Sequence, residues 1–350
     1  MLCEPCPSDD ASRRELTEFL LAAFHLPPGA PFVRPELLRW KYDEPRLDFP
    51  GPRSYVCRDG GKEIVAHACV CPVTYNLPTR DVKAAYLIDW GAARSSPGAG
   101  TSLLRSMAKK FDVLLAVGGS PDTQTILPKL GYRKVGEMQV FARVLRAWDQ
   151  FRSDPFPRGW KAPLRLARNV LWSRGEAPPV AEGWTAQPTG AFDRSCQPLF
   201  EDRAHFAFPS TRRTPALMNY WLACPGAAMS ASLVRYNGEI RGWFVLSRVL
   251  GQARIVDLWV NSNLVADWAA AFSLAVRAAM QDPEANELIA AVSIPPATEA
   301  APLAGLRARP AEPIFALDPN NCFGPGPALN VTPLESDLAY VQDPSYPYLT

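Results

Sequence analysis

The sequence lacks the features that would place the protein in a membrane. No run of 18 apolar residues occurs, and the most apolar helical stretch, Trp268 to Met280, is interrupted by Arg277, whereas a spanning helix needs about 20 apolar residues. The first residues include Glu4, where a signal peptide needs basic residues. We therefore expect a cytoplasmic protein without a membrane partner. In that compartment its eight cysteines should be mostly reduced, so that disulfides do not contribute to the fold.

The net charge is small, and the sequence contains few histidines. Lys and Arg number 37 and Asp and Glu 35, a net charge of +2 that does not favour nucleic-acid binding as the main task of the surface. Cys3-x-x-Cys6 and Cys69-x-Cys71 resemble two pairs of zinc ligands, but the second pair has strand spacing, so we favour reduced thiols and no metal. Of the three histidines, His67 lies on a predicted strand and is expected to pack in the core.

Two catalytic motifs are absent as well. The sequence contains no Gly-x-Ser-x-Gly elbow and no Gly-Lys-Ser/Thr phosphate loop. This absence excludes the usual serine hydrolases and P-loop nucleotidases.

Proline, in contrast, is abundant. The 36 prolines among 350 residues are about twice the usual share, and they show no period, so they are expected to separate many short elements. A hydrophobic fraction of 47% is typical of a globular protein, and the length favours two domains of about 150 residues.

The first 145 residues alternate predicted helices and strands. Ser12 to Glu15 has the capping-box pattern and predicts a helix over 12–24. The other predicted elements are a helix over 35–42, strands over 54–58, 63–73 and 82–91, a helix opened by Gly98, a strand over 113–117, a helix over 124–130 and a strand over 134–145.

The second half repeats this order. Tyr220 to Pro225 has the aromatic-then-proline spacing of Trp40 to Pro45, and Val256-Asp257 matches Ile88-Asp89, each at an offset of about 170 to 180 residues. A helix over 267–280 and a strand over 288–292 follow. We predict two copies of one α/β fold, with domains over 1–147 and 181–350 and a basic, Pro-rich linker over 148–180.

Within this linker, Pro163 to Arg174 is predicted to form a basic amphipathic helix. We favour a helix with its basic face in solvent. An acidic partner or a membrane surface is the alternative.

One strand–loop–helix segment suggests chemistry. The strand ends in Asp89-Trp90-Gly91-Ala92, and Gly98-Ala99-Gly100-Thr101 opens the next helix. Glycine lets the backbone approach a ligand, and the free amides at a helix start suit a pyrophosphate.

This order, together with Ser120-Pro121-Asp122 and Leu130-Gly131-Tyr132 downstream, resembles the GNAT N-acyltransferase superfamily, well over residues 1–145 and loosely over 180–345. The resemblance implies a mixed α/β sheet that splays beside the strand ending near Gly91, two tandem GNAT-like domains, and acetyl-CoA or another acyl-CoA as co-substrate. It implies donor binding by Trp90, Gly91, Ala92, Gly98, Ala99, Gly100 and Thr101.

Asp89, on the same strand, is the candidate base, acting directly or through a water. Its alternative role is a structural carboxylate, because Asp257 holds the equivalent place in a half that lacks the glycine pair. The second half is expected to line the acceptor pocket instead.

Two positions depart from the family pattern. Ser95 stands where members usually have Arg or Gln, and Leu127 where a tyrosine often protonates the leaving thiolate. The expected function is acyl transfer to a small-molecule amine or amino sugar. The alternatives are a Fem-type transferase that uses aminoacyl-tRNA, supported by the basic stretch Arg158 to Arg174, and a non-catalytic binding protein.

Overall fold

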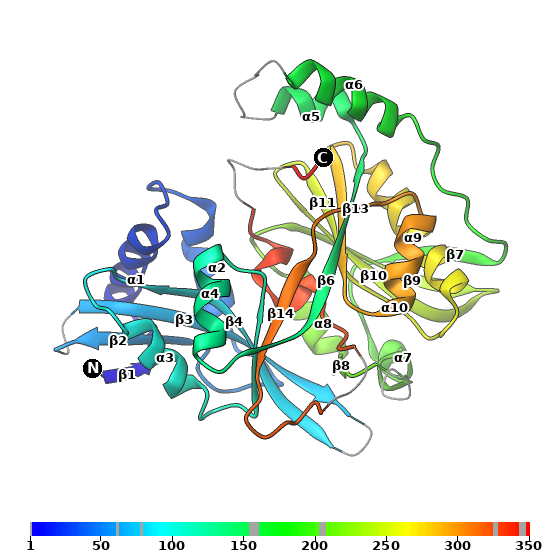
Figure 1. Cartoon of the computed structure of the whole chain (residues 1–350). Helices are drawn as coiled ribbons and strands as arrows, with labels where there is room; N and C mark the ends of the chain where they lie inside the picture. Colours follow the sequence, from blue (N-terminus) through cyan, green and yellow to red (C-terminus); the bar gives the residue numbers. More distant parts are fainter. Residues whose placement is uncertain are drawn as a thin grey trace. The chain divides into compact units, whose positions relative to one another are not determined.

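The structure is a computed structural model that describes residues 2–60, 63–77, 80–153, 161–202, 208–324, 328–342 and 348–350 (Figure 1). The chain forms two compact units. The first contains Met1–Gly136 and Pro313–Gly326, and the second contains Glu137–Glu312 and Pro327–Thr350. Each unit therefore includes a segment from the other half of the chain. The domain limits at 147 and 181 stay a prediction.

The first unit is built on a mixed sheet with the strand order β1-β2-β3-β4-β5-β14. Neighbouring strands are antiparallel except β4 and β5, which are parallel. The strands are β1 Leu2–Pro5, β2 Ser54–Asp59, β3 Glu63–Asn76, β4 Asp81–Ala92, β5 Val113–Val117 and β14 Glu312–Leu317. Strand β3 is buried over most of its length, as expected for a strand covered on both faces.

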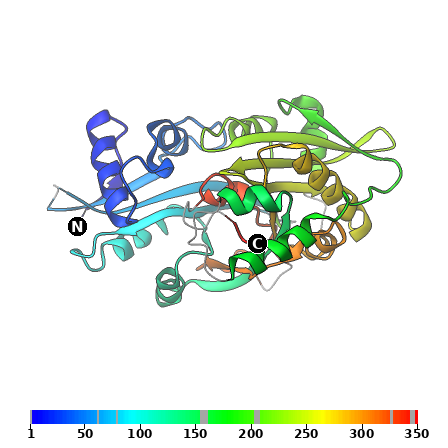
Figure 2. The ribbon, with the colours of Figure 1, turned by 90° about the horizontal axis from the view of Figure 1, so that it is seen from above.

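In the described residues, the α-helices that pack on this sheet are α1 Asp10–Ala23, α2 Pro35–Tyr42, α3 Ala99–Met107 and α4 Pro121–Lys129. Figure 2 shows α1 and α3 on opposite sides of the strands. Helix α3 packs on β2, β3 and β4 through a core cluster that includes Leu103, Leu104, Met107 and, from α4, Leu127.

The start of α1 differs from the sequence prediction. The N-cap is Asp9, whose carboxylate accepts from the amides of Ala11 and Ser12, both at 3.0 Å. Glu15 does not close a capping box, because its carboxylate binds Arg58 at 2.7 Å and the amide of Ile64 at 3.1 Å. A tertiary ion pair thus replaces the predicted local contact.

The second unit repeats the sheet. Its strand order is β7-β9-β10-β11-β12-β6, with the same orientations, so that β11 and β12 form the parallel pair. The strands are β6 Arg133–Val144, β7 Trp184–Thr189, β9 Ala228–Tyr236, β10 Glu239–Val249, β11 Gln252–Val260 and β12 Glu287–Val292, with short strands β8 Ser210–Thr211 and β13 Arg307–Ala308. The mixed α/β repeat predicted from the sequence is therefore present in both sheets.

The helices of the second unit are α5 Ala147–Ser153, α6 Ala162–Ser173, α7 Gln197–Asp202, α8 Pro215–Leu222, α9 Val265–Gln281 and α10 Pro295–Leu303. Helix α6 agrees with the predicted basic helix over 163–174, whereas residues 158–160 of the basic stretch lie outside the described residues. Within the described ranges, no helix has the length and apolarity needed to cross a bilayer.

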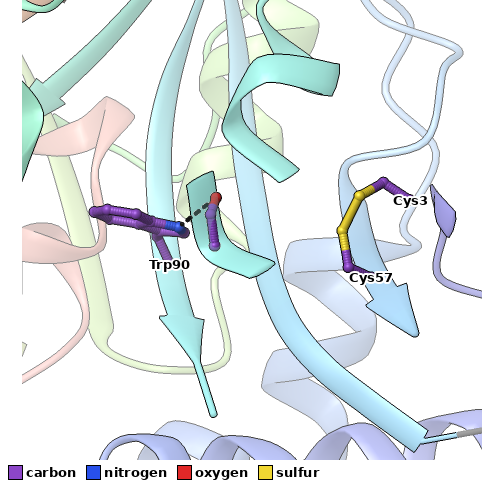
Figure 3. The surroundings of a disulfide bond; sticks show 4 residues. Cys3, Cys57 and Trp90 are labelled. Carbon is purple, nitrogen blue, oxygen red and sulfur yellow. Dashed lines mark hydrogen bonds between the residues drawn. A yellow bond between two sulfur atoms is a disulfide. The ribbon is translucent and has the colours of Figure 1, made fainter. Parts of the chain in front are cut away.

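The expectation that cysteines form no disulfide was wrong for one pair. Cys3 and Cys57 are bonded and stand directly opposite each other on the antiparallel strands β1 and β2 (Figure 3). This register brings their β-carbons within bonding reach, although the residues are 54 positions apart. The other six cysteines are free thiols.

Candidate functional site

The predicted splay of the first sheet is present between β4 and β5. Their pairing runs from Ala84 opposite Val113 to Tyr86 opposite Leu115. Beyond this point β4 continues to Ala92 and β5 to Val117 without further pairs. The edge of β4 from Leu87 onward is therefore not part of a ladder with β5, which leaves its backbone groups on that edge for other partners.

A β-bulge lies in the diverging part of β4. His67 of β3 is opposite Gly91 and Cys69 is opposite Ile88, so that Asp89 and Trp90 together face one residue of β3. Asp89 has a φ of 52°, in the left-handed region that aspartate tolerates better than most side chains. The bulge directs Asp89 toward α2 and Trp90 toward α3, as their contacts show.

The Asp89 side chain is fully buried in an ion pair. Its Oδ2 lies 2.5 Å from the Lys41 Nζ and accepts from the Tyr42 hydroxyl at 2.7 Å. The Lys41 and Asp89 side chains are 2% and 0% exposed, and the ammonium also lies 4.4 Å from the ring centre of Phe32. Asp89 Oδ1 has no hydrogen-bond partner among the described residues. This contact set matches the structural alternative and leaves one oxygen for a base.

His67 fixes the backbone of the bulge. Its Nδ1 lies 3.0 Å from the Asp89 carbonyl oxygen and its Nε2 lies 3.0 Å from Ser54 Oγ. Complete burial lowers the pKa of His67 to about 4, so the ring is neutral near pH 7. Because a carbonyl only accepts, Nδ1 carries the proton and the Ser54 hydroxyl donates to Nε2. The expected core histidine is thus also a hydrogen-bonding residue, which sequence reasoning missed.

Helix α3 offers an open start next to Trp90. Gly98, with a φ of 85°, is its N-cap and supplies no side-chain cap, and the first turn contains no acid. The amides of Gly100 and Thr101, in that turn, have no acceptor within the helix. Such a start binds anions through its amides and its dipole.

The structure brings several predicted donor residues together at this start. The Trp90 Nε1 donates to the Gly100 carbonyl at 3.3 Å (dashed in Figure 3). A β-carbon on Gly100 would lie 3.0 Å from Trp90 Nε1 and 3.2 Å from the β-carbon of Ala92. Gly91 faces elsewhere, since a β-carbon there would lie 3.4 Å from Ala23 of α1.

The equivalent place in the second unit is chemically different. The Asp257 side chain is fully buried, and its Oδ2 accepts from Arg213 Nε at 3.1 Å and Trp243 Nε1 at 3.0 Å. Helix α9 has Asp267 in its first turn, bound by Ser262 Oγ at 2.5 Å. A carboxylate at a helix start repels a second anion. Of the two equivalent helix starts, α3 suits a pyrophosphate and α9 does not.

Leu127 is buried in the core and supplies no hydroxyl, as the sequence indicated. A nearby phenol was not anticipated: Tyr132, in the same core cluster, has a buried hydroxyl without a partner in the described part of the chain. Burial raises the pKa of Tyr132, which keeps it protonated. Ser95 is exposed. No group of three or more His, Cys, Asp or Glu among the described residues is arranged to hold a metal ion.

Comparison with solved structures identifies the fold. A GCN5-related N-acetyltransferase from Anabaena variabilis superposes with a TM-score of 0.58 at 13% identity, covering 92% of this chain and 74% of that one. Saccharomyces cerevisiae N-myristoyltransferase with bound myristoyl-CoA gives 0.59 at 11%, covering 91% and 82%. A probable N-acyltransferase from Enterococcus faecalis gives 0.57 at 12%, covering 90% and 72%.

No protein-family model matches the sequence, and no curated protein is similar to it. The structural likeness nevertheless extends over about nine tenths of the chain. The chain therefore has the fold of the GNAT N-acyltransferases, and the resemblance predicted from its motifs is confirmed for the fold.

Replacing Asp89 tests the buried ion pair. We expect Asp89→Asn to lower the free energy of unfolding by about 3 kcal/mol or more, because it removes the negative charge that faces the buried Lys41 ammonium. The double variant Asp89→Asn/Lys41→Met removes both charges and should recover at least half of that loss. Urea unfolding measures both values, and equal stability of the single and double variants would contradict the pairing.

His67 predicts a specific pH dependence of stability. The unfolded chain binds a proton on this ring near pH 6.5 and the folded chain only near pH 4, so unfolding takes up a proton between these values. Protonation of His67 therefore does not reduce the free energy of unfolding above pH 6.5, and it reduces it progressively as the pH falls from 6.5 towards 4. Between pH 7 and 4.5 the wild type should lose about 2 to 3 kcal/mol more than His67→Gln. Parallel stability curves of the two proteins, from urea unfolding at each pH, would refute the assignment.

Proposed function

We propose that the protein is an acyl-CoA-dependent N-acyltransferase that binds its donor in the first unit and acylates a small-molecule amine or amino sugar. The observation that carries this proposal is the divergence of β4 from β5 beside the open start of α3. The fold shared with N-acyltransferases supports it.

The donor would be held by two groups of residues. The pyrophosphate fits the first turn of α3, where the amides of Gly100 and Thr101 have no acceptor within the helix and Gly98 and Ala99 add little side-chain bulk. The Ala99 amide itself donates to the Ser96 carbonyl at 3.2 Å. The pantetheine arm fits the unpaired edge of β4, where its amide groups replace the missing strand partner. Trp90 and Ala92 connect the two, because both lie against Gly100.

The reaction needs positioning more than covalent catalysis. The amine nitrogen attacks the thioester carbon, the carbonyl oxygen becomes negative, and the C–S bond breaks to release the CoA thiolate. Backbone amides of β4 aimed at that oxygen stabilise the charge, and alignment of amine and thioester lowers the barrier further. Leu127 supplies no proton to the thiolate, so solvent must do so.

The amine must also lose a proton. Asp89 remains our candidate base through its free oxygen Oδ1, with a neighbouring water as relay. Its burial and its contacts with Lys41 and Tyr42 favour a second role, in which it holds the bulge that exposes the edge of β4.

The acyl chain is expected to be acetyl, with longer acyl-CoA as the alternative. A specific observation also favours a second function: with Leu127 in place of an acid and Asp89 in an ion pair, a non-catalytic protein that binds an acyl-CoA would retain the same donor site. The aminoacyl-tRNA alternative has the basic helix α6 as its support.

Donor binding is tested by isothermal titration with acetyl-CoA and a longer acyl-CoA. We expect Gly100→Glu to abolish binding, because the carboxylate places bulk against Trp90 and negative charge in the first turn of α3. Ala11→Glu is the matched control, since it adds the same side chain to the exposed first turn of α1. Absence of binding by the wild type, or equal binding by Gly100→Glu, would refute the donor site.

Turnover of a panel of amines, followed by release of the CoA thiol, separates catalysis from binding alone. The double variant Asp89→Asn/Lys41→Met, which leaves neither charge of the buried pair, separates the two roles of Asp89. A base at this position predicts a loss of kcat of about 100-fold or more, with donor affinity unchanged. Near-normal turnover would exclude a base at this position, and a loss of donor affinity together with kcat would instead make Asp89 a positioning residue. Absence of turnover in the wild type with intact donor binding would favour the non-catalytic alternative.

A further inference from the structure

The second unit contains a cluster of arginines around Trp172, and none of these residues belongs to the proposed donor site of the first unit. The guanidinium carbons of Arg168, Arg307 and Arg309 lie 4.4, 4.7 and 5.3 Å from the centre of the Trp172 ring. These distances are those of cation–π contacts, so one indole is in contact with three cations.

Regular secondary structure brings the cluster together. Arg168 and Trp172 are four residues apart on α6 and therefore lie on one helix face. Arg307 lies on β13, which pairs with β6. The Arg309 amide extends this pairing by donating to the Val140 carbonyl of β6 at 2.8 Å. The positions of the arginines are thus set by a helix and a sheet.

A fourth arginine, Arg143, is buried next to the cluster. Arg143 of β6 is 8% exposed, and its Nη2 donates to the carbonyls of Gly175 at 3.0 Å and Glu176 at 2.9 Å. Its Nε has no acceptor among the described residues, and the same holds for Nε and Nη2 of Arg309. The cluster therefore retains unused N–H donors.

Among the described residues, no acid forms a close ion pair with these arginines. Within the described residues, no carboxylate lies within 4 Å of Arg143, Arg168, Arg307 or Arg309. Burial and the neighbouring arginines lower the pKa values of three of them, with Arg307 acting on both Arg143 and Arg309, and Arg309 acting on Arg168. Like charges this close repel each other in the protein and are relieved by an anion.

One buried acid does act on Arg309 at longer range. Glu287 has both carboxylate oxygens occupied, by Gln252 at 2.7 Å, by the amide of Leu349 at 3.0 Å and by the hydroxyl of Thr350 at 2.5 Å. Its hydrogen bonds are thus made elsewhere, and it does not occupy the free donors of Arg309.

We propose that this arginine–tryptophan cluster is a binding site for a compact phosphate-bearing anion, of the size of a diphosphate or a phosphomonoester. Guanidinium groups match phosphate oxygens in pairs of hydrogen bonds, which suits the unused donors. Three guanidinium carbons lie within 5.3 Å of one ring centre, so the positive charge is concentrated in one place. This concentration suits a compact anion better than an extended polyanion, whose charges are spread along its length.

The test is isothermal titration of the full chain with sodium pyrophosphate at low ionic strength, where charge interactions are least screened. Titration of the Gly100→Glu variant removes the start of α3 as a competing site. We expect saturable binding that persists in that variant. Arg307→Gln and Arg309→Gln should each weaken it about tenfold or more, as expected for loss of charge-assisted hydrogen bonds.

Arg241→Gln is the matched control, because Arg241 belongs to the same unit but is exposed and paired with Glu239 at 2.8 Å. Its affinity for pyrophosphate should equal that of the wild type, and circular dichroism confirms that every variant is folded. Absence of saturable binding, or unchanged affinity in both cluster variants, overturns the proposal. Retention of RNA or of anionic lipid vesicles without pyrophosphate binding also overturns it, in favour of an extended polyanion.

Discussion

The backbone of Asp89 adopts a left-handed conformation inside a strand, and the candidate site depends on it. A left-handed residue other than glycine costs about 1–2 kcal/mol, so it persists only where its surroundings hold it. Here the His67 N–H binds the Asp89 carbonyl, while Lys41 and Tyr42 hold the carboxylate. The resulting bulge turns Trp90 onto the start of α3, next to the part of β4 that has left β5. The two elements of the proposed donor site, β4 and α3, are thus linked through one residue.

The two units share one framework but differ in the side chains at the equivalent helix start. In both units the parallel pair of strands separates: β4 and β5 pair only as far as Tyr86, and β11 and β12 only as far as Ile255. Each unit also has a register shift between the antiparallel pair next to it, β3 with β4 or β10 with β11, and a buried aspartate beside that shift. In the second unit Trp243 and Arg213 bind that aspartate, and Asp267 occupies the helix start. The same framework therefore accommodates either set of partners, and the two helix starts differ by a few side chains: α9 carries Asp267 in its first turn and α3 has no acid there.

Local sequence patterns predicted those element bounds that depend only on residues close together in the sequence. The strand Val113–Val117 and the helix Pro35–Tyr42 have the predicted bounds, because apolar runs and proline positions mark them directly. The N-cap was misplaced by one turn, because Asp9 and Ser12 are both good caps and tertiary pairing of Glu15 decided between them. The disulfide and the Lys41 contact with Asp89 join residues about 50 positions apart, and no local pattern contains the strand register that brings such residues together.

The first unit includes a strand from the end of the chain, β14, and this affects the order in which the protein can fold. Strand β14 completes the first sheet beside β5, yet the ribosome makes it some 200 residues later. Until then, β5 has an unpaired edge, and an open edge of apolar residues is prone to pair with other chains. The first half must therefore wait for nearly the whole chain before its sheet is complete, so a chain truncated before β14 is expected to aggregate.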